Sequence, residues 1–360
     1  MATNKQQGEP GVMADKIKEI EGGIGTTAEE ASTGFKGLDL GTSHLVMATV
    51  QDDREVYEKE LHAFVSIPYS KMTKAMLERE KINHRVQRPN IIAFGNRVDE
   101  FANILGGNTR RPMQTGLLNP DEPKNIELVE LAIRNLCGRA KKGEKICFSV
   151  PSAPEGHESR LLFHEESVRA VLENLGYKVR TINESLAVVI AELQDYDFTG
   201  IGISFGGGMC NICLSYLGLP VVTFATTRAG DYIDGSTAEV TGESATTVRL
   251  RKEDPGFALF GSDNPSSVDR ALSIYYREVI QTVAITMERV LGSTKNLPPF
   301  KGPLPLVFSG GTSLVGGFQK ELRAAIRKAK LPVEISDVIP AESGLNATAR
   351  GALVAAMLEG

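Results

Sequence analysis

Two glycine-rich turns, each placed directly after an apolar segment, contain the residue types that phosphate binding requires. The first lies in the run GLDLGTSH at residues 37–44, and the second lies in GISFGGGMCN at residues 202–211. Because glycine has no Cβ, backbone N–H groups in such turns can approach phosphate oxygens closely. Two turns of this kind facing each other would hold a triphosphate from both sides. That arrangement requires two similar lobes with a cleft between them.

The two turns align residue by residue on their glycines, and the alignment shows one chemical difference. Asp39 of the first turn falls opposite Ser204 of the second. The residues that would face the phosphates are then two equivalent triplets, Gly41, Thr42 and Ser43 in the first turn and Gly206, Gly207 and Gly208 in the second. The first turn therefore carries an acid and hydroxyls, whereas the second offers mainly backbone donors.

A third glycine turn, FSGGTSL at residues 308–314, again follows an apolar segment. Its glycines would let the backbone lie flat against a purine or a ribose, and the hydroxyls of Thr312 and Ser313 can form hydrogen bonds with ligand atoms. A single Gly-Gly pair after a strand is usually only a turn. The interpretation as a nucleotide site depends on the order and context of all three turns.

Size and composition limit the classes of function. With 360 residues the chain suits two lobes, and a hydrophobic content of 41% supports real cores. The formal net charge of −5 gives no basic footprint, so we expect no direct binding to nucleic acid. The sequence contains no run of about 18 apolar residues and no signal-peptide pattern, so we expect no transmembrane segment and a cytoplasmic location.

Four cysteines are present, and two of them, Cys210 and Cys213, form a C-x-x-C pair. A redox pair or half of a metal site is one interpretation of this spacing. However, residues three apart in a strand point to opposite faces, and the chain has no second C-x-x-C. We therefore expect buried, reduced thiols.

The order of predicted elements indicates an α/β fold. Residues 1–34 are polar and are expected to form a disordered tail. Lobe I is expected at 35–199 with an inserted subdomain at about 51–115, and lobe II at 200–360 with an insert at about 231–266. In lobe I a helix, strand, helix, strand and helix are expected to alternate, which implies a parallel arrangement; their ranges are 125–137, 145–150, 158–175, 177–182 and 185–193.

Five motifs in sequence resemble those of the actin, Hsp70 and sugar-kinase superfamily, and within it the bacterial actins of the MreB and MamK type. The resemblance covers about residues 35–358. It rests on the two phosphate motifs, the first connecting helix, the adenosine motif and the second connecting helix, which read GLDLGTSH, ISFGGGMCNI, INESLAVVIAEL, FSGGTSLVGG and TARGALVAA. The run at residues 90–120 is also similar to the segment that leads out of the small subdomain of lobe I in these proteins.

The resemblance implies an actin-like ATPase fold of two duplicated ribonuclease-H-like lobes, each with an inserted small subdomain, with ATP and Mg²⁺ bound between them. Asp39 would hold the Mg²⁺ through water, since a carboxylate suits a hard cation that keeps its hydration shell. Thr42 and Ser43 would meet the β- and γ-phosphates. Glu184 would orient the attacking water, which makes Glu184 and Asp39 the expected catalytic residues.

Adenosine contacts are also implied by the resemblance. In the run RAGDYID, Gly230 and Asp231 match a motif near the ribose. The segment at residues 241–253 matches the family's adenosine-contacting segment loosely and offers Glu243 and Arg251. The third turn adds four further candidates, Gly310, Gly311, Thr312 and Leu314.

The second phosphate motif departs from the family pattern. An Asp usually stands where this chain has Ser204, and hydroxylated residues usually stand where it has Met209 and Cys210. Serine brings no charge to the metal site, and thioether and thiol groups are poor partners for phosphate or water. We therefore expect ATP to be bound but hydrolysed slowly.

The expected function is that of an actin-like protein that binds ATP and assembles with copies of itself into cytoplasmic filaments, together with an unidentified cargo or adaptor protein. The main alternative is a non-polymerising, ATP-sensing adaptor similar to FtsA or PilM. A small-molecule kinase would need a general base beside an acceptor pocket, and the sequence offers no acid for it beyond those already assigned. An Hsp70-type chaperone would need a further substrate-binding region after the second connecting helix.

Overall fold

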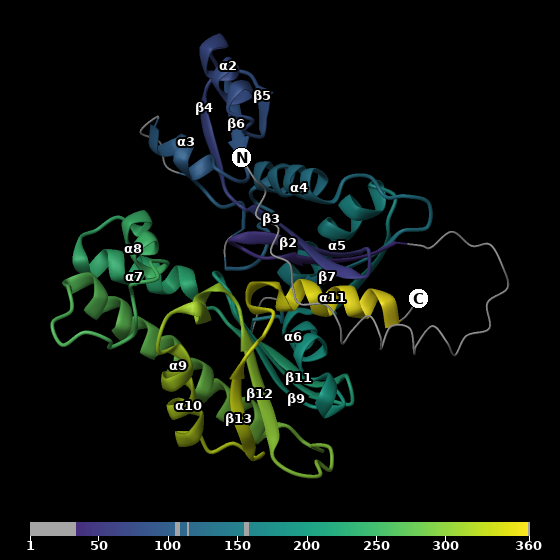
Figure 1. Cartoon of the computed structure of the whole chain (residues 1–360), viewed down its shortest axis with the longest axis vertical. Coiled ribbons are helices and arrows are strands. Elements are labelled where there is room, and N and C mark those ends of the chain that lie inside the picture. The colour runs from purple at the N-terminus through teal and green to yellow at the C-terminus, as the bar shows by residue number, and fades with distance from the viewer. Residues whose placement is uncertain (1–33, 105–108, 114, 155–157, 359–360) are drawn as a thin grey trace.

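The computed structural model describes residues 34–104, 109–113, 115–154 and 158–358. Nearly all of the predicted tail at residues 1–34 therefore lies outside the described residues. Two five-stranded sheets dominate the rest, one in each half of the chain, with helices between and around them (Figure 1).

The sheet of the first lobe has the strand order β3-β2-β1-β7-β8. Its first three strands form an antiparallel meander, and β7 and β8 run parallel to β1. In the buried strands β1, β2 and β7, apolar residues either alternate with other residues or form a continuous run. A continuous apolar run is typical of a strand that is covered on both faces. The bounds are β1 Phe35–Leu40, β2 His44–Gln51, β3 Arg54–Leu61, β7 Lys145–Val150 and β8 Lys178–Asn183.

The sheet of the second lobe repeats this design with the order β11-β10-β9-β12-β13. Again three antiparallel strands are followed by two strands parallel to the first. In the two sheets β1 and β9 thus occupy the same central place, and each leads into a glycine turn. The bounds are β9 Gly200–Phe205, β10 Cys210–Tyr216, β11 Leu219–Thr226, β12 Leu304–Ser309 and β13 Ile335–Pro340.

Two helices, α6 (Glu184–Glu192) and α11 (Ala347–Leu358), lie between the two sheets (Figure 1). The side chain of Asn183 caps α6 by accepting hydrogen bonds from the backbone N–H groups of Ser185 and Leu186. The two helices cross at Gly351, where an added Cβ would lie 1.8 Å from the carbonyl oxygen of Ala187. Only glycine permits this approach.

Other helices cover the outer faces of the sheets. In the first lobe these are α4 (Pro123–Cys137) and α5 (Glu158–Asn174), and in the second they are α9 (Ser267–Ser293) and α10 (Phe318–Lys328). In the part of the chain that the structure describes, three short 3₁₀ helices lie in the connections, at Gln194–Tyr196, Gly311–Leu314 and Gly344–Asn346. None of the helices in the described ranges combines the length and apolar character that crossing a membrane requires.

Each lobe carries a small insert. In the first lobe a three-stranded sheet of order β4-β6-β5 packs with two helices, and in the second lobe the insert contains α7 and α8. The bounds are β4 Phe64–Pro68, α2 Lys71–Arg79, β5 His84–Gln87, β6 Asn90–Phe94, α3 Val98–Ile104, α7 Gly230–Thr241 and α8 Ala245–Lys252.

The first insert begins later in the chain than the sequence analysis expects. Residues 54–61, interpreted there as part of a charged, irregular insert, form β3 and pair with β2 along its whole length. β3 lies at the edge of its sheet and is partly exposed, so it tolerates the charged sequence REVYEKEL. Its charge content therefore hid a strand of the main sheet.

The four cysteines are free and buried, as the sequence analysis predicts. On β10, Cys210 packs into the core of the second lobe, whereas Cys213 packs into the cluster around α6 and α11. The two thiols therefore face opposite sides of one strand. Neither is placed to form a disulfide or a shared metal site with the other.

Candidate functional site

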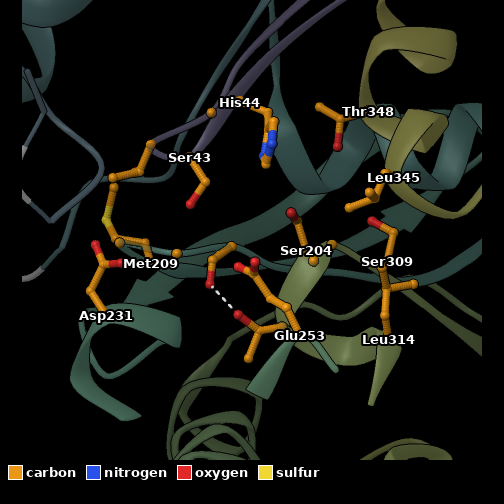
Figure 2. Close-up of a pocket in the computed structure, with 18 of the residues that line it drawn as sticks. Ser43, His44, Ser204, Met209, Asp231, Glu253, Ser309, Leu314, Leu345 and Thr348 are labelled. Carbon is orange, nitrogen blue, oxygen red and sulfur yellow. Dashed lines mark hydrogen bonds between the residues drawn. The ribbon is translucent and has the colours of Figure 1, made fainter. Parts of the chain in front are cut away.

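A cavity of about 530 Å³ lies between the two lobes. Its wall is formed by the three glycine turns, which follow β1, β9 and β12, and by the first residue of α6. Met209 and Asp231 lie at one end of the group drawn in Figure 2, and Ser309, Leu314 and Leu345 lie at the other. The duplicated topology therefore brings Asp39 and Ser204, which are 165 positions apart in the sequence, to one site, because equivalent strands end at facing edges.

The first and second turns approach each other closely at the glycines of the second. A Cβ on Gly207 would lie 2.8 Å from the hydroxyl oxygen of Ser43, and one on Gly208 would lie 2.8 Å from that of Thr42. Among the described residues no acceptor is bonded to the backbone N–H groups of these four residues. The turns thus offer a cradle of unused donors at one end of the cavity.

Two of the carboxylates that line the cavity are Asp39 and Glu184. The hydroxyl of Ser149 donates to Asp39 Oδ1 at 2.8 Å. Glu184 accepts two hydrogen bonds, one at 2.6 Å from the hydroxyl of Ser204 and one at 2.9 Å from the side-chain amide of Asn211. Ser204 and Asn211 are directly paired across β9 and β10, so one register fixes both donors.

Burial raises the pKa of both carboxyl groups above their ordinary values. For Asp39 the hydrogen bond from Ser149 opposes this effect only in part. For Glu184 the neighbouring charge on Asp39 raises the pKa further, and the hydrogen bonds from Ser204 and Asn211 oppose it. Ionisation of both carboxyl groups in this one cavity is therefore unfavourable. A hard cation bound by the two carboxylates would offset that cost.

Three basic side chains also line the cavity, and the sequence analysis assigned none of them. Arg111 contacts the hydroxyl of Ser43 and lies 3.7 Å from the carboxylate of Asp231 in the opposite lobe. Lys252 forms an ion pair of 2.7 Å with Asp234. Arg111 belongs to the run at residues 90–120 that carried part of the family resemblance, so the sequence did contain a signal for it. The third basic residue is Lys59 on β3.

The four candidates from the third turn, Gly310, Gly311, Thr312 and Leu314, all line the cavity. The turn is tied to the second phosphate turn, because the hydroxyl of Thr312 donates to the carbonyl of Gly206 at 2.8 Å. Gly310 has φ of 98°, and a Cβ there would lie 2.3 Å from the carbonyl oxygen of Phe205. With Leu314 and Leu345 partly exposed on its wall, this end suits a flat, apolar ring.

The remaining adenosine candidates are distributed differently. Asp231 lines the cavity, whereas Gly230 lies behind the wall and donates its N–H to the carbonyl of Gly206 at 3.1 Å. The structure does not bring Glu243 or Arg251 to the cavity: Glu243 is exposed between α7 and α8, and Arg251 pairs with Asp269 at 2.7 Å.

The helical phase of α8 explains why Arg251 faces away from the cavity although its neighbour Lys252 lines it. Successive residues of a helix are about 100° apart, so Arg251 and Lys252 at its end face different directions. Lys252 and Glu253 line the cavity in place of the expected pair.

Comparison with known proteins gives one family and several similar structures. The model of the family described as Volactin matches residues 35–356. The structure is similar to the MamK double helical filament, with a TM-score of 0.67 and 17% identity over 90% of this chain and 99% of that chain. It is also similar to MreB 5 of Spiroplasma citri bound to AMPPNP, with a TM-score of 0.63 and 15% identity over 89% and 95% of the two chains.

A third similar structure is the ethanolamine utilization protein EutJ from Carboxydothermus hydrogenoformans, with a TM-score of 0.53 and 15% identity over 95% of this chain and 98% of that chain. At the level of sequence, no curated protein matches the chain. At these identities the structures establish the fold. The expected actin-like α/β fold of the bacterial type is thereby confirmed.

Proposed function

Because the chain belongs to the volactin family and has an actin-like fold, we propose that it binds ATP and Mg²⁺ between its lobes and polymerises into filaments. One observation carries the proposal of nucleotide binding. The glycine turns that end β1 and β9, at equivalent places in two duplicated sheets, face each other across a cavity that holds Asp39. The MreB 5 structure similar to this chain is one bound to AMPPNP, which agrees with this assignment.

The residues present fit a Mg²⁺–nucleotide complex. Asp39 and Glu184 supply carboxylate oxygen atoms as ligands. Burial disfavours the ionisation of both carboxyl groups, and a divalent cation would offset that cost. The hydroxyl of Ser309, which also lines the cavity, is buried without a hydrogen-bond partner among the described residues. When bound, Mg²⁺ would neutralise phosphate charge. Asp39 is the residue proposed to hold it through water.

Hydrolysis would depend on Glu184. Its two oxygen atoms are held by Ser204 and Asn211, so the carboxylate has one fixed orientation at the head of α6. Held in this way, it can accept a hydrogen bond from a water molecule beside the terminal phosphate. Both oxygen atoms already accept one hydrogen bond, and the raised pKa of Glu184 favours its neutral form, which is a weak base. This supports slow hydrolysis.

Filament formation is proposed from the likeness to the MamK double helical filament and from membership of the family. We place the filaments in the cytoplasm, where a cargo or adaptor protein would attach to them. The alternative is a protein with the same fold that binds ATP and remains unassembled while it contacts its partner.

Sedimentation without nucleotide, with ADP and with ATP, each with Mg²⁺, tests the proposal. ATP is expected to move most of the protein into the pellet, and negative-stain microscopy of that pellet is expected to show filaments. Binding of ATP without a pellet under any condition would favour the unassembled adaptor. Failure to bind any nucleotide would contradict the proposal as a whole.

A further inference from the structure

Lys59 differs from the other basic residues of the cavity in having no counter-charge. The described part of the chain places three lysine and arginine side chains on the cavity wall. Arg111 faces Asp231, and Lys252 is paired with Asp234. The ammonium group of Lys59 forms no ion pair and no hydrogen bond within this part of the chain.

The register of the first sheet directs Lys59 toward the phosphate end of the cavity. Asp39 on β1 lies opposite Val46 on β2, and Val46 lies opposite Lys59 on β3. Residues directly opposite in antiparallel strands project from the same face, and all three line the cavity. The backbone of Lys59 is therefore two strands, or about 10 Å, away from the backbone of Asp39. Its long, flexible stem can cross the space over Val46.

An unpaired ammonium in this position is unfavourable in the absence of an anion. Burial lowers the pKa of Lys59, and no neighbouring acid opposes that effect. The first glycine turn, from Gly41 to His44, contains no lysine or arginine of its own. Cationic side chains at this turn must therefore come from other elements; Arg111 contacts Ser43 but faces Asp231, whereas a phosphate would supply the missing partner of Lys59.

We propose that the ammonium group of Lys59 binds the terminal phosphates of the nucleotide. The proposal rests on the function proposed above, namely that the cleft binds ATP. It makes β3, the edge strand of the first sheet, a contributor to the phosphate site. In this proposal the phosphates are bound both by backbone donors of the two turns and by one charged side chain beside them.

Isothermal titration of ATP, ADP and adenosine into the wild type, Lys59→Met and Lys59→Arg tests this. Lys59→Met is expected to weaken ATP binding by about tenfold or more, because a hydrogen bond to a charged group is lost, and to leave adenosine binding unchanged. Lys59→Arg keeps the charge and is expected to retain most of the affinity for ATP. Lys74→Met, on α2 and paired with Glu78 outside the cavity, is the matched control and is expected to behave as the wild type.

The outcomes separate the two proposals. Equal ATP affinity in Lys59→Met and the wild type would overturn the role of Lys59 and leave nucleotide binding intact. A parallel loss of adenosine affinity would also overturn it, since that result would mean a general structural defect. If the wild type bound none of the three compounds, the proposed function would fail first, and the role of Lys59 with it.

Discussion

Ser204 stands where the resemblance to bacterial actins implies an aspartate, and its contacts give that difference a physical meaning. Its hydroxyl donates to Glu184 at 2.6 Å, so the serine orients the carboxyl group beside it and favours its ionised form. An aspartate at this position would bring a further negative charge next to Asp39 and Glu184. That charge would favour a divalent cation and remove a donor from Glu184.

We expect Ser204→Asp to hydrolyse ATP several times faster than the wild type when Mg²⁺ is present. The added carboxylate strengthens the metal site, and Glu184, with one donor fewer, is freer to bind water. Phosphate release measured under single-turnover conditions is the direct readout. Ser204→Ala removes the same hydrogen bond without adding charge and is the control. Equal or slower release in Ser204→Asp would refute this account of slow hydrolysis.

Glu184 should make the free protein less stable as the pH rises. Its pKa is raised in the folded state, so between its ordinary value of 4.5 and the raised value the folded chain binds more protons than the unfolded chain. The free energy of unfolding therefore falls with rising pH in that window, by at most about 1.4 kcal/mol per pH unit for one proton. The contribution is fully present below pH 4.5 and is lost as the pH passes the folded pKa.

Glu184→Gln, a neutral isostere, is expected to remove this part of the pH dependence. Melting temperatures recorded without nucleotide or metal from pH 5 to pH 9 would show the wild type losing stability relative to the variant. Two parallel curves would mean that Glu184 is ionised throughout the range.

At the scale of elements, the contact between α6 and α11 sets the distance between the two lobes. An alanine at position 351 would place its Cβ 1.8 Å from the carbonyl oxygen of Ala187, so the helices would have to separate. We expect Gly351→Ala to lower the free energy of unfolding by about 1–3 kcal/mol, the usual cost of overpacking. Urea denaturation followed by circular dichroism measures the change.

Gly235→Ala is the matched control, because it is the same substitution in the helix α7 at a position where the added Cβ meets nothing within 4 Å. A modest stabilisation of about 0.5–1 kcal/mol is expected there from the better helix propensity of alanine. Gly351→Ala as stable as the wild type would mean that the two helices can move apart freely.

Elements whose residues are uniformly buried were predicted better from the sequence than elements that are partly exposed. The strand predicted at residues 145–150 has the observed bounds of β7, because a continuous apolar run marks it. β3 was missed because an edge strand can be charged, and β13 because most of its side chains are partly or fully exposed. At the site, the glycine turns were identifiable from local sequence. Lys59 was not, because only the pairing of β2 with β3 brings it to the cavity.

On the scale of the whole molecule, the two lobes are joined across the mouth of the cleft by side chains as well as by helices. Arg249 on α8 forms an ion pair of 3.0 Å with Asp99 on α3, and the hydroxyl of Thr109 also donates to Asp99. The two inserts therefore touch, and Arg111 with Asp231 makes a second link deeper in the cleft. These contacts hold the described conformation closed.

Asp99→Asn should loosen this closure. The partly buried pair with Arg249 contributes on the order of 1 kcal/mol, so we expect a fluorescent ATP analogue to dissociate about two- to fivefold faster. Stopped-flow displacement by excess ATP measures the rate. Asp121→Asn, an exposed substitution outside the cleft, should leave it unchanged. An unaltered rate in Asp99→Asn would show that the inserts do not control access.

The crossing of α6 and α11 at Gly351 has a mechanical consequence. A backbone contact that admits no further atom resists compression, so the lobes cannot slide together along this line, but they can turn about it. The crossing then acts as a pivot, and different parts of the lobes lie at very different distances from it. The strands that lead into the phosphate turns, β1 and β9, contact α11 and α6, whereas the tips of the inserts, at α2 and α8, lie far from both helices (Figure 1). A rotation too small to break the phosphate cradle would swing those tips over a much longer arc.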